Sequence, residues 1–540
     1  LEVCRRDTQI ATAITGRVER VGSRYTLGLE AIDAGTGLAT EVVSAETDQP
    51  EELLRLSRDL ASRLVDSVKG RSKPELEPVT TNSLQAAQLY TLANRMLLRH
   101  NLGGKDMNAA AEELLLEAVA EDPAFASAHL LLAWAVMRQG RATGDFLPHA
   151  DRALELLESA TEAERFFIRG SRLSLAEEHE ASIPIYQALI DRYPDHFWGT
   201  NNLSFAFYRT GRPAEEADLQ VILADLRPTS LRLNYAAAHD LAMLGDSRVE
   251  LFAARTRKLL APNDWEGRWG FVPFWIESRT AHRAWLEGDL QELVSELGRL
   301  ETLKDRILDA QLRQRAEAQL AFMEIGMGRL EAGRGRLEAL DMDYRGRDEM
   351  LVRAAYLTED RGALERYLDG AIARVKEHSR YTIIPNLLVR TGRLAEAEEL
   401  LGELRLDREY EASLRTALAL ARSDPKEALD ILEQAPEFVN HASTGYFLHC
   451  EVLAEAYLEM DMPRRARAVL ERASKQRVRA AATVAMPAWI RNQQLLAVLY
   501  REMGVNDRAT EIEAELSQLL ALGDADHPIK RWLAEVGAGA

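Results

Sequence analysis

Residues 11–46 alternate apolar and polar side chains at a period of two, a pattern that is absent from the chain after residue 83. The alternating runs are ATAITGRVERV, SRYTLGLEAID and LATEVVSAET, with AGTG as a turn between the second and the third. This pattern predicts a three-stranded meander with one apolar face. The segment at 50–68 places leucines at helical spacing, so we expect a helix that covers part of that face.

A polar, proline-containing segment at 71–82 is interpreted as a linker. It divides the chain into a small α/β domain at 1–70 and a helical region at 83–540. In the helical region, amphipathic segments of about 12 to 16 residues alternate with short turns that contain Gly, Asp or Pro. The predicted fold class is therefore mainly α, with a small α/β domain in front.

The turns of the helical region recur at a regular distance. The stretch RTGRPAEEA at 209–217 returns as RTGRLAEAE at 390–398, and Gly211 and Gly392 are each placed to end a helix in the left-handed conformation. Pro194, Pro228 and Pro262 follow one another at intervals of 34 residues. A 34-residue helix-turn-helix repeat is typical of tetratricopeptide repeats, which stack into a right-handed α-solenoid. We expect roughly ten to twelve helix pairs.

Two helices of such a repeat pack closely when a small residue lies five positions after the turn residue. The residues that meet this requirement are Gly333, Ala397, Ala466 and Ala509. In the repeat that follows Gly211, the same position holds Glu216, with Ala217 one place later. We interpret this as a shift in the phase of that hairpin.

Composition and charge argue against several classes of partner and cofactor. The net charge is −19 and the isoelectric point about 5.2, which argues against nucleic acid or an anionic membrane as the main partner, because both require a basic surface. The two cysteines lie far apart, and the histidines show no metal-ligand spacing, so no metal or cofactor is expected. No apolar run is long enough to span a membrane.

Several segments, in this order along the chain, resemble the carboxy-terminal region of bacterial eukaryotic-like serine/threonine protein kinases. They are AITGRVERVGSRYTLGLEAIDAGTG, TTNSLQAAQLY, DPAFASAHLLLAWA, ATEAERFFIRG and DRYPDHFWGTNNLSFAFYRTG. The resemblance implies a TolB-like half-domain at 1–70 followed by tetratricopeptide repeats. It covers about the first 230 residues, and the remainder is similar only as a repeat architecture.

In that kinase family, the catalytic domain and one membrane span precede the region that this chain resembles. The chain carries no glycine-rich phosphate loop, no His-Arg-Asp loop and no Asp-Phe-Gly, so we expect it to be non-catalytic. Because it begins with LEVCRR, we expect it to be a piece of a longer polypeptide, and the half-domain to be truncated. The expected location is the envelope or periplasmic side if a span precedes it, and the cytoplasm otherwise.

Three groups of residues are candidates for partner binding. Asn201 and Asn202, on the first helix of the best-formed repeat, could hold an extended peptide backbone, or could instead cap or solvate a helix entrance. An aromatic stretch could anchor a partner peptide, or could fill an irregular junction between repeats. The candidate residues of this stretch are Trp265, Arg268, Trp269 and Trp275.

The third group is the basic stretch PRRARAVLERASKQRVRA at 463–480, a local reversal of sign in an acidic chain. Arg464, Arg465 and Arg467 could receive an acidic peptide or a phosphate, or the stretch could be a solvated face that compensates neighbouring acidic helices.

The sequence thus predicts a non-catalytic interaction and sensing region that binds protein or peptide partners in a solenoid groove. A kinase on the same polypeptide is the favoured context, and the effector-sensing tail of a winged-helix transcription regulator is the alternative. Oligomerisation is expected through the half-domain, whose strands should have an unpaired edge or be completed by another copy.

Overall fold

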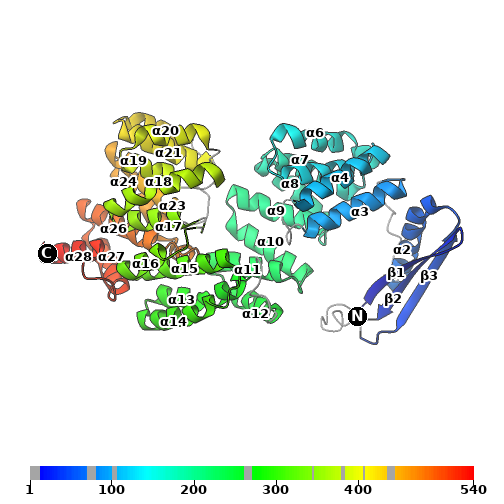
Figure 1. Ribbon diagram of the computed structural model, residues 1–540, viewed down its shortest axis with the longest axis horizontal. Helices are drawn as coiled ribbons and strands as arrows, with labels where there is room; N and C mark the ends of the chain where they lie inside the picture. The colour runs from blue at the N-terminus through cyan, green and yellow to red at the C-terminus, as the bar shows by residue number, and fades with distance from the viewer. Residues whose placement is uncertain are drawn as a thin grey trace. The chain divides into compact units, whose positions relative to one another are not determined.

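The computed structural model describes residues 12–33, 35–69, 81–99, 106–260, 270–342, 344, 346–378, 383–404, 408–434 and 444–539. The chain divides into two compact units, residues 1–210 and residues 211–540. Figure 1 shows the order of the elements, with a small sheet near the amino terminus and helices elsewhere. The predicted fold class, a tetratricopeptide-type α-solenoid preceded by a small α/β part, is confirmed.

Three antiparallel strands form a sheet of order β1-β2-β3, joined by tight turns. The strands are β1 (Thr12–Val21), β2 (Arg24–Asp33) and β3 (Ala39–Thr47), followed by the short 3-10 helix η1 (Pro50–Glu52) and by α2 (Leu53–Lys69). Helix α2 packs against β2 and β3, where Leu27, Ala31 and Val43 are buried beneath Leu60 and Leu64. The alternation at a period of two puts these apolar side chains on the helix-covered face.

The helices of the first unit form antiparallel hairpins, in which neighbouring helices pack along their length. They are α3 (Leu84–Arg99), α4 (Asp106–Glu121), α5 (Ala126–Met137), α6 (Thr143–Glu155), the 3-10 helix η3 (Leu157–Ser159), α7 (Glu162–Leu175), α8 (His179–Arg192) and α9 (Phe197–Thr210). The first helices of successive hairpins, α3, α5, α7 and α9, also contact one another in that order. They therefore form one continuous row.

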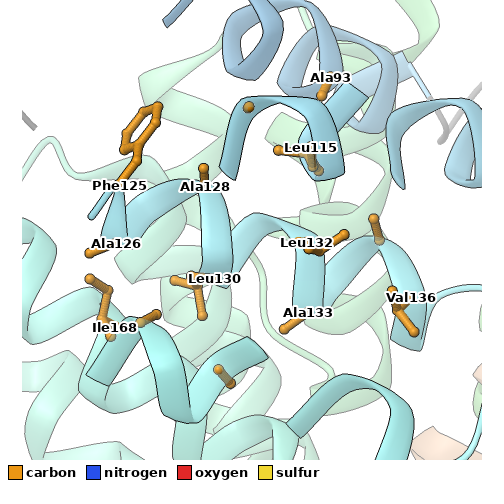
Figure 2. Packing of buried hydrophobic residues seen from close by; sticks show 14 of the residues in the cluster. Ala93, Leu115, Phe125, Ala126, Ala128, Leu130, Leu132, Ala133, Val136 and Ile168 are labelled. Atoms are coloured by element: carbon orange, nitrogen blue, oxygen red, sulfur yellow. The ribbon is translucent and has the colours of Figure 1, made fainter. Parts of the chain in front are cut away.

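The core between these hairpins is built from alanine and leucine (Figure 2). Ala128, Leu132 and Ala133 on α5 are fully buried, as are Leu115 on α4 and Ile168 on α7. Alanine lets two helices approach closely, and leucine fills the space between the turns, so each hairpin is covered by the next. This packing holds the row of first helices in place.

The second unit is also built from helical hairpins. Its helices are α10 (Pro213–Leu226), α11 (Leu231–Leu244), α12 (Val249–Leu259), α13 (Phe271–Glu287), α14 (Leu290–Lys304), α15 (Ala310–Gly326), α16 (Leu330–Glu338), α17 (Arg347–Leu357), α18 (Arg361–His378), α19 (Ile384–Arg390), α20 (Leu394–Glu403), α21 (Arg408–Ala421), α22 (Pro425–Gln434), α23 (Thr444–Glu459), α24 (Pro463–Ser474), α25 (Arg477–Ala482), α26 (Met486–Glu502), α27 (Asn506–Leu519) and α28 (Pro528–Gly539).

The predicted turn chemistry is confirmed. Gly211 and Gly392 both have positive φ angles, 72° and 81°, which glycine adopts without the steric cost that a side chain adds. The small residues expected at the helix crossings are buried, and a Cβ atom on Gly333 would lie 2.7 Å from the carbonyl oxygen of Ala321. The division at 1–70, 71–82 and 83–540 stays a prediction, because most of 71–82 lies outside the described residues.

The carboxy-terminal helices of the second unit fold back onto its earlier helices. Helix α25 packs against α11 and α13, and α26 packs against α15 and α17. The approach of α26 is close, because a Cβ atom on Gly326 would lie 2.9 Å from the Cβ atom of Met486. The row of first helices in this unit is thus covered by the chain's own end.

Candidate functional site

A pocket of about 180 Å³ lies on the row of first helices in the first unit. Each helix turns one side into it, since the lining residues of a helix are spaced three or four apart. Among the lining residues are Tyr90 and Asn94 on α3, Trp134 and Arg138 at the end of α5, Glu164 and Phe167 on α7, and His196, Trp198 and Asn202 at the start of α9. Four aromatic rings and several polar groups therefore share one hollow.

Arg138 is the positively charged side chain of this pocket. Its guanidinium is half-buried and lies 5.9 Å from the centre of the Trp134 ring, a cation–π distance. Burial lowers its pKa, and no acidic group contributes to that shift. Within the described residues, no carboxylate pairs with Arg138. A half-buried guanidinium without an anion is less stable than a paired one, so the pocket favours a ligand that brings a carboxylate.

Two other polar side chains of the pocket, Glu164 and His196, are already engaged. One carboxylate oxygen of Glu164 accepts from Ser127 Oγ at 2.6 Å, and the other accepts the backbone N–H of Thr161 at 2.9 Å, as part of the cap of α7. His196 Nδ1 accepts the backbone N–H of Gly199 at 2.9 Å, which leaves the proton of the neutral ring on Nε2. Burial lowers the pKa of His196, so the ring is neutral at pH 7.

The aromatic side of the pocket is held by ring contacts. Tyr90 packs against Phe125 with ring centres 5.0 Å apart, and Phe167 packs against His196 at 5.5 Å. Burial raises the pKa of Tyr90 to about 12, so its hydroxyl remains a neutral donor. The rings therefore offer a fixed apolar surface, which can take up an apolar side chain with little ordering entropy.

Asn201 and Asn202 lie where the sequence suggested, on the first helix α9. Asn202 lines the pocket and is buried, and its Nδ2 donates to Tyr186 Oη at 3.1 Å. The Nδ2 of Asn201 donates to Asn202 Oδ1 at 3.2 Å, and Asn201 is half-buried. Their role in holding a peptide stays a prediction, and Asn202 is the sequence-predicted site residue that the structure places in this pocket.

The aromatic stretch is placed elsewhere. Trp275 lies on α13 in the interior of the second unit, 3% exposed, with its ring edge-on to Tyr235 at 5.1 Å. It packs within the protein and does not face solvent. Trp265, Arg268 and Trp269 lie outside the described residues.

Some arginines of the basic stretch are exposed to solvent, and others pack against the protein itself. Arg464 is exposed, Arg465 lies 3.4 Å from Glu433, and Arg467 lies 3.3 Å from Glu471. Further along, the Arg477 guanidinium lies over the rings of Trp285 and Trp489 at 5.2 and 5.3 Å, and pairs with Glu515. Asn201 and Asn202 belong to the first unit and these arginines to the second, and a ligand role for Arg464, Arg465 and Arg467 stays a prediction.

The sequence analysis missed most of the pocket, although a signal exists. An aromatic residue is followed four positions later by a polar one on three of the first helices. The pairs are Tyr90 and Asn94, Trp134 and Arg138, and Trp198 and Asn202. Four residues make about one helical turn, so each pair points to the same side, which identifies the face that the pocket occupies.

A buried histidine and a buried cysteine, His449 and Cys450, are neighbours on α23. Burial raises the pKa of Cys450 to about 12 and lowers the pKa of its neighbour His449 to about 4, so both are neutral at pH 7. In the described part of the chain, no three His, Cys, Asp or Glu side chains are grouped so that they could hold a metal ion. Among the described helices, none has the length and apolar character to cross a membrane.

Glu216 on α10, the residue found where other repeats have Gly or Ala, is buried. Burial and the charge of Asp240 raise its pKa from 4.5 to about 8, against the attraction of Arg479. Folding therefore takes up a proton at neutral pH, and the stability of the second unit falls as pH rises from about 4.5 to about 8.

We expect Glu216→Gln to raise the free energy of unfolding by about 3 kcal/mol at pH 7, and to leave it unchanged near pH 4. Glutamine mimics the protonated acid of the folded state and removes the ionisation that stabilises the unfolded chain. Melting temperatures measured from pH 4 to 9 check this, with the exposed neighbour Glu215→Gln as the matched control. A variant less stable than wild type at pH 7 would show that the attraction of Arg479 for the ionised carboxylate dominates instead.

Comparisons with known proteins give no family for this chain. No protein-family description matches it, and no curated protein does. Among solved structures it is similar to MamA 41-end from Desulfovibrio magneticus RS-1, at 15% identity over 33% of this chain and 94% of that one, with a TM-score of 0.23. It is also similar to the TPR domain of P58(IPK), at 14% over 70% and 98%, with a TM-score of 0.20. A third is Naa15/Naa10 bound to HypK-THB, at 16% over 83% and 65%, with a TM-score of 0.26.

Proposed function

We propose that this chain is a non-catalytic interaction region that binds an extended peptide segment of a protein partner on the row of helices α3, α5, α7 and α9. The observation that carries the proposal is the half-buried Arg138, which has an aromatic neighbour and no carboxylate partner within the described residues. The pocket beside it, about 180 Å³, is smaller than the roughly 300 Å³ at which sites for drug-sized molecules begin. Its size fits one large side chain.

The ligand chemistry follows from these two features. An apolar or aromatic side chain of the partner occupies the space between Trp134, Phe167 and Trp198. A carboxylate of the same segment, from Asp, Glu or a chain end, accepts hydrogen bonds from the Arg138 guanidinium. Both surfaces are preformed by packed helices, so binding costs little ordering of this chain.

A panel of fluorescein-labelled peptides tests this proposal. Each peptide carries one Phe or Leu near a Glu, and its matched control carries Gln instead of Glu. We expect the Glu peptides to bind the full chain about tenfold or more tighter than the Gln peptides, because a buried charged hydrogen bond contributes about 1.5 to 3 kcal/mol. Fluorescence anisotropy gives both dissociation constants.

Arg138→Ala is expected to remove this difference and to leave the melting temperature within about 1 °C of wild type, because within the described residues the side chain loses only its contact with the Trp134 ring and no carboxylate. The matched control is Arg141→Ala, since Arg141 lies three residues away but already pairs with Glu112 at 2.9 Å. Failure of every peptide to bind, or equal binding of Glu and Gln peptides, would overturn the proposal.

We also propose that this interaction region belongs to a larger signalling protein, with a serine/threonine kinase as the first expectation and a winged-helix regulator as the second. This part rests on the sequence resemblance alone. Reading the native coding sequence upstream of Leu1 tests it. A kinase catalytic domain followed by an apolar span would support the kinase, a winged helix would support the regulator, and a start codon there would contradict both.

A further inference from the structure

The sheet of the first unit has apolar side chains that its own helix does not cover. Directly paired residues of an antiparallel sheet point to the same face, and Val18 pairs with Leu27 while Ile14 pairs with Ala31. Leu27 and Ala31 are 5% and 0% exposed beneath α2, yet Val18 and Ile14 are each 58% exposed. The difference arises because α2 packs on β2 and β3. The apolar face therefore continues past the helix, along β1.

Strand β1 is also an open edge. It pairs with β2 through ten residues in unbroken register from Thr12 to Val21, and within the described residues its other side meets no strand. The opposite edge, β3, pairs with β2 through a register irregularity at Ala31 and Ile32, a feature that discourages further strand addition. A long, regular strand without a bulge is a template for another strand.

We propose that β1 pairs antiparallel with β1 of a second copy of this chain, about a two-fold axis through Val18. In this register, Val18 faces Val18 of the second copy. Arg17 faces Glu19 of the second copy, and Glu19 faces its Arg17, so two opposite-charge pairs form by symmetry. Within one copy, Arg17 and Glu19 lie 3.3 Å apart, and they are 71% and 55% exposed, so each can also reach the facing strand of the second copy.

Other registers between β1 and β1 of the second copy match the charged side chains less well. An axis through Arg17 or through Glu19 sets two like charges directly opposite one another, which destabilises a strand pair. An axis through Gly16 leaves Arg17 opposite Thr15 and Glu19 opposite Ala13, so no charge is matched. The register through Val18 pairs Arg17 with Glu19 twice, sets Arg20 opposite Gly16, and keeps an apolar pair at its centre.

The paired sheet has an unbroken apolar row on its helix-covered face. The row runs from Ala45 through Leu27 to Val18 in one copy, as the strand pairing gives it, and continues in reverse order in the second copy. Two copies of α2 flank this row on one face, because a two-fold axis perpendicular to the sheet leaves its faces unchanged.

The dimer also carries two peptide pockets, so a partner with two matching segments binds with increased avidity.

Sedimentation of the full chain over a wide range of concentrations tests the dimer. We expect wild type to dimerise, and Arg17→Glu and Glu19→Arg each to raise the dissociation constant about tenfold or more, because each sets like charges opposite one another twice. An equimolar mixture of the two variants should form a heterodimer, since the two acidic side chains of the first variant then face the two basic side chains of the second. Both substitutions are at exposed strand positions, so we expect each variant to fold as wild type does. Far-UV circular dichroism checks this.

The control is Glu46→Arg on the other edge strand, which should leave dimerisation unchanged. Val18→Lys is a second disrupting variant and should be monomeric, with the melting temperature of the isolated monomer. A wild type that stays monomeric, single charge variants that dimerise as well as wild type, a mixture that does not associate, or a loss of the dimer in Glu46→Arg would each overturn the inference.

Discussion

Replacing Trp285 with alanine is expected to destabilise residues 211–540 by about 3 to 5 kcal/mol and to release the carboxy-terminal helices from the earlier ones. Trp285 on α13 is fully buried. Its Nε1–H donates to the carbonyl oxygen of Gly326 at 3.2 Å, and its ring meets Trp489 of α26 edge-on at 5.6 Å. Loss of the ring leaves a large cavity between α13, α15 and α26, and leaves a buried carbonyl without its donor.

Urea unfolding followed by circular dichroism measures the loss of stability, and limited proteolysis reports on the release of α25 and α26. Trp489→Ala should cost a similar amount, and the double variant should cost clearly less than the two single losses together, because both remove one contact. Trp198→Ala, at a half-buried pocket position, is the matched tryptophan control and should cost less. Additive losses would show that the two rings do not act as one contact.

The sequence carries the local features of this fold. A period of two over 11–46 identified the strands, and the 34-residue spacing of turns identified the hairpins, because both depend on neighbours in the chain. Glu216 was visible as the exception among Gly and Ala, but its burial and raised pKa depend on Asp240 and Arg479, which other helices bring to it. The sequence pattern shows that a glutamate at position 216 is unusual, but its burial and its raised pKa arise only in the folded chain.

The fold-back of the second unit was not predictable in the same way. It depends on contacts such as Gly326 with Met486, whose partners lie far apart in sequence and show no shared period. The basic stretch at 463–480 illustrates this, since Arg477 lies over two tryptophan rings of its own chain and is unavailable as a surface charge. As a result, the exposed row of first helices, and with it the pocket, belongs to the first unit.

A buried charged cluster stabilises the fold-back. Glu451 on α23 is 2% exposed, accepts a hydrogen bond from Tyr356 on α17, and lies 3.2 Å from Arg491 on α26 and 3.7 Å from Arg390 on α19. One carboxylate thus joins four helices. Tyr356 has a raised pKa because burial, and next the charge of Glu451, disfavour its anion, so its hydroxyl stays a donor.

We expect Glu451→Ala to lower the free energy of unfolding of the second unit by about 3 to 5 kcal/mol, since two largely buried guanidinium groups lose their shared carboxylate. Glu455→Ala is the matched control, because Glu455 also pairs with Arg390, at 3.0 Å, but is 49% exposed. An exposed pair contributes at most about 1 kcal/mol, and salt screens it. The urea concentration at the unfolding midpoint, measured for both variants at low and at high salt, distinguishes the buried pair from the exposed pair. A second carboxylate, that of Glu359, pairs with Arg491 at 2.9 Å. A Glu451→Ala loss as small as that of Glu455→Ala would show that Glu359 and Glu455 already satisfy both arginines, and that Glu451 does not hold the four helices together.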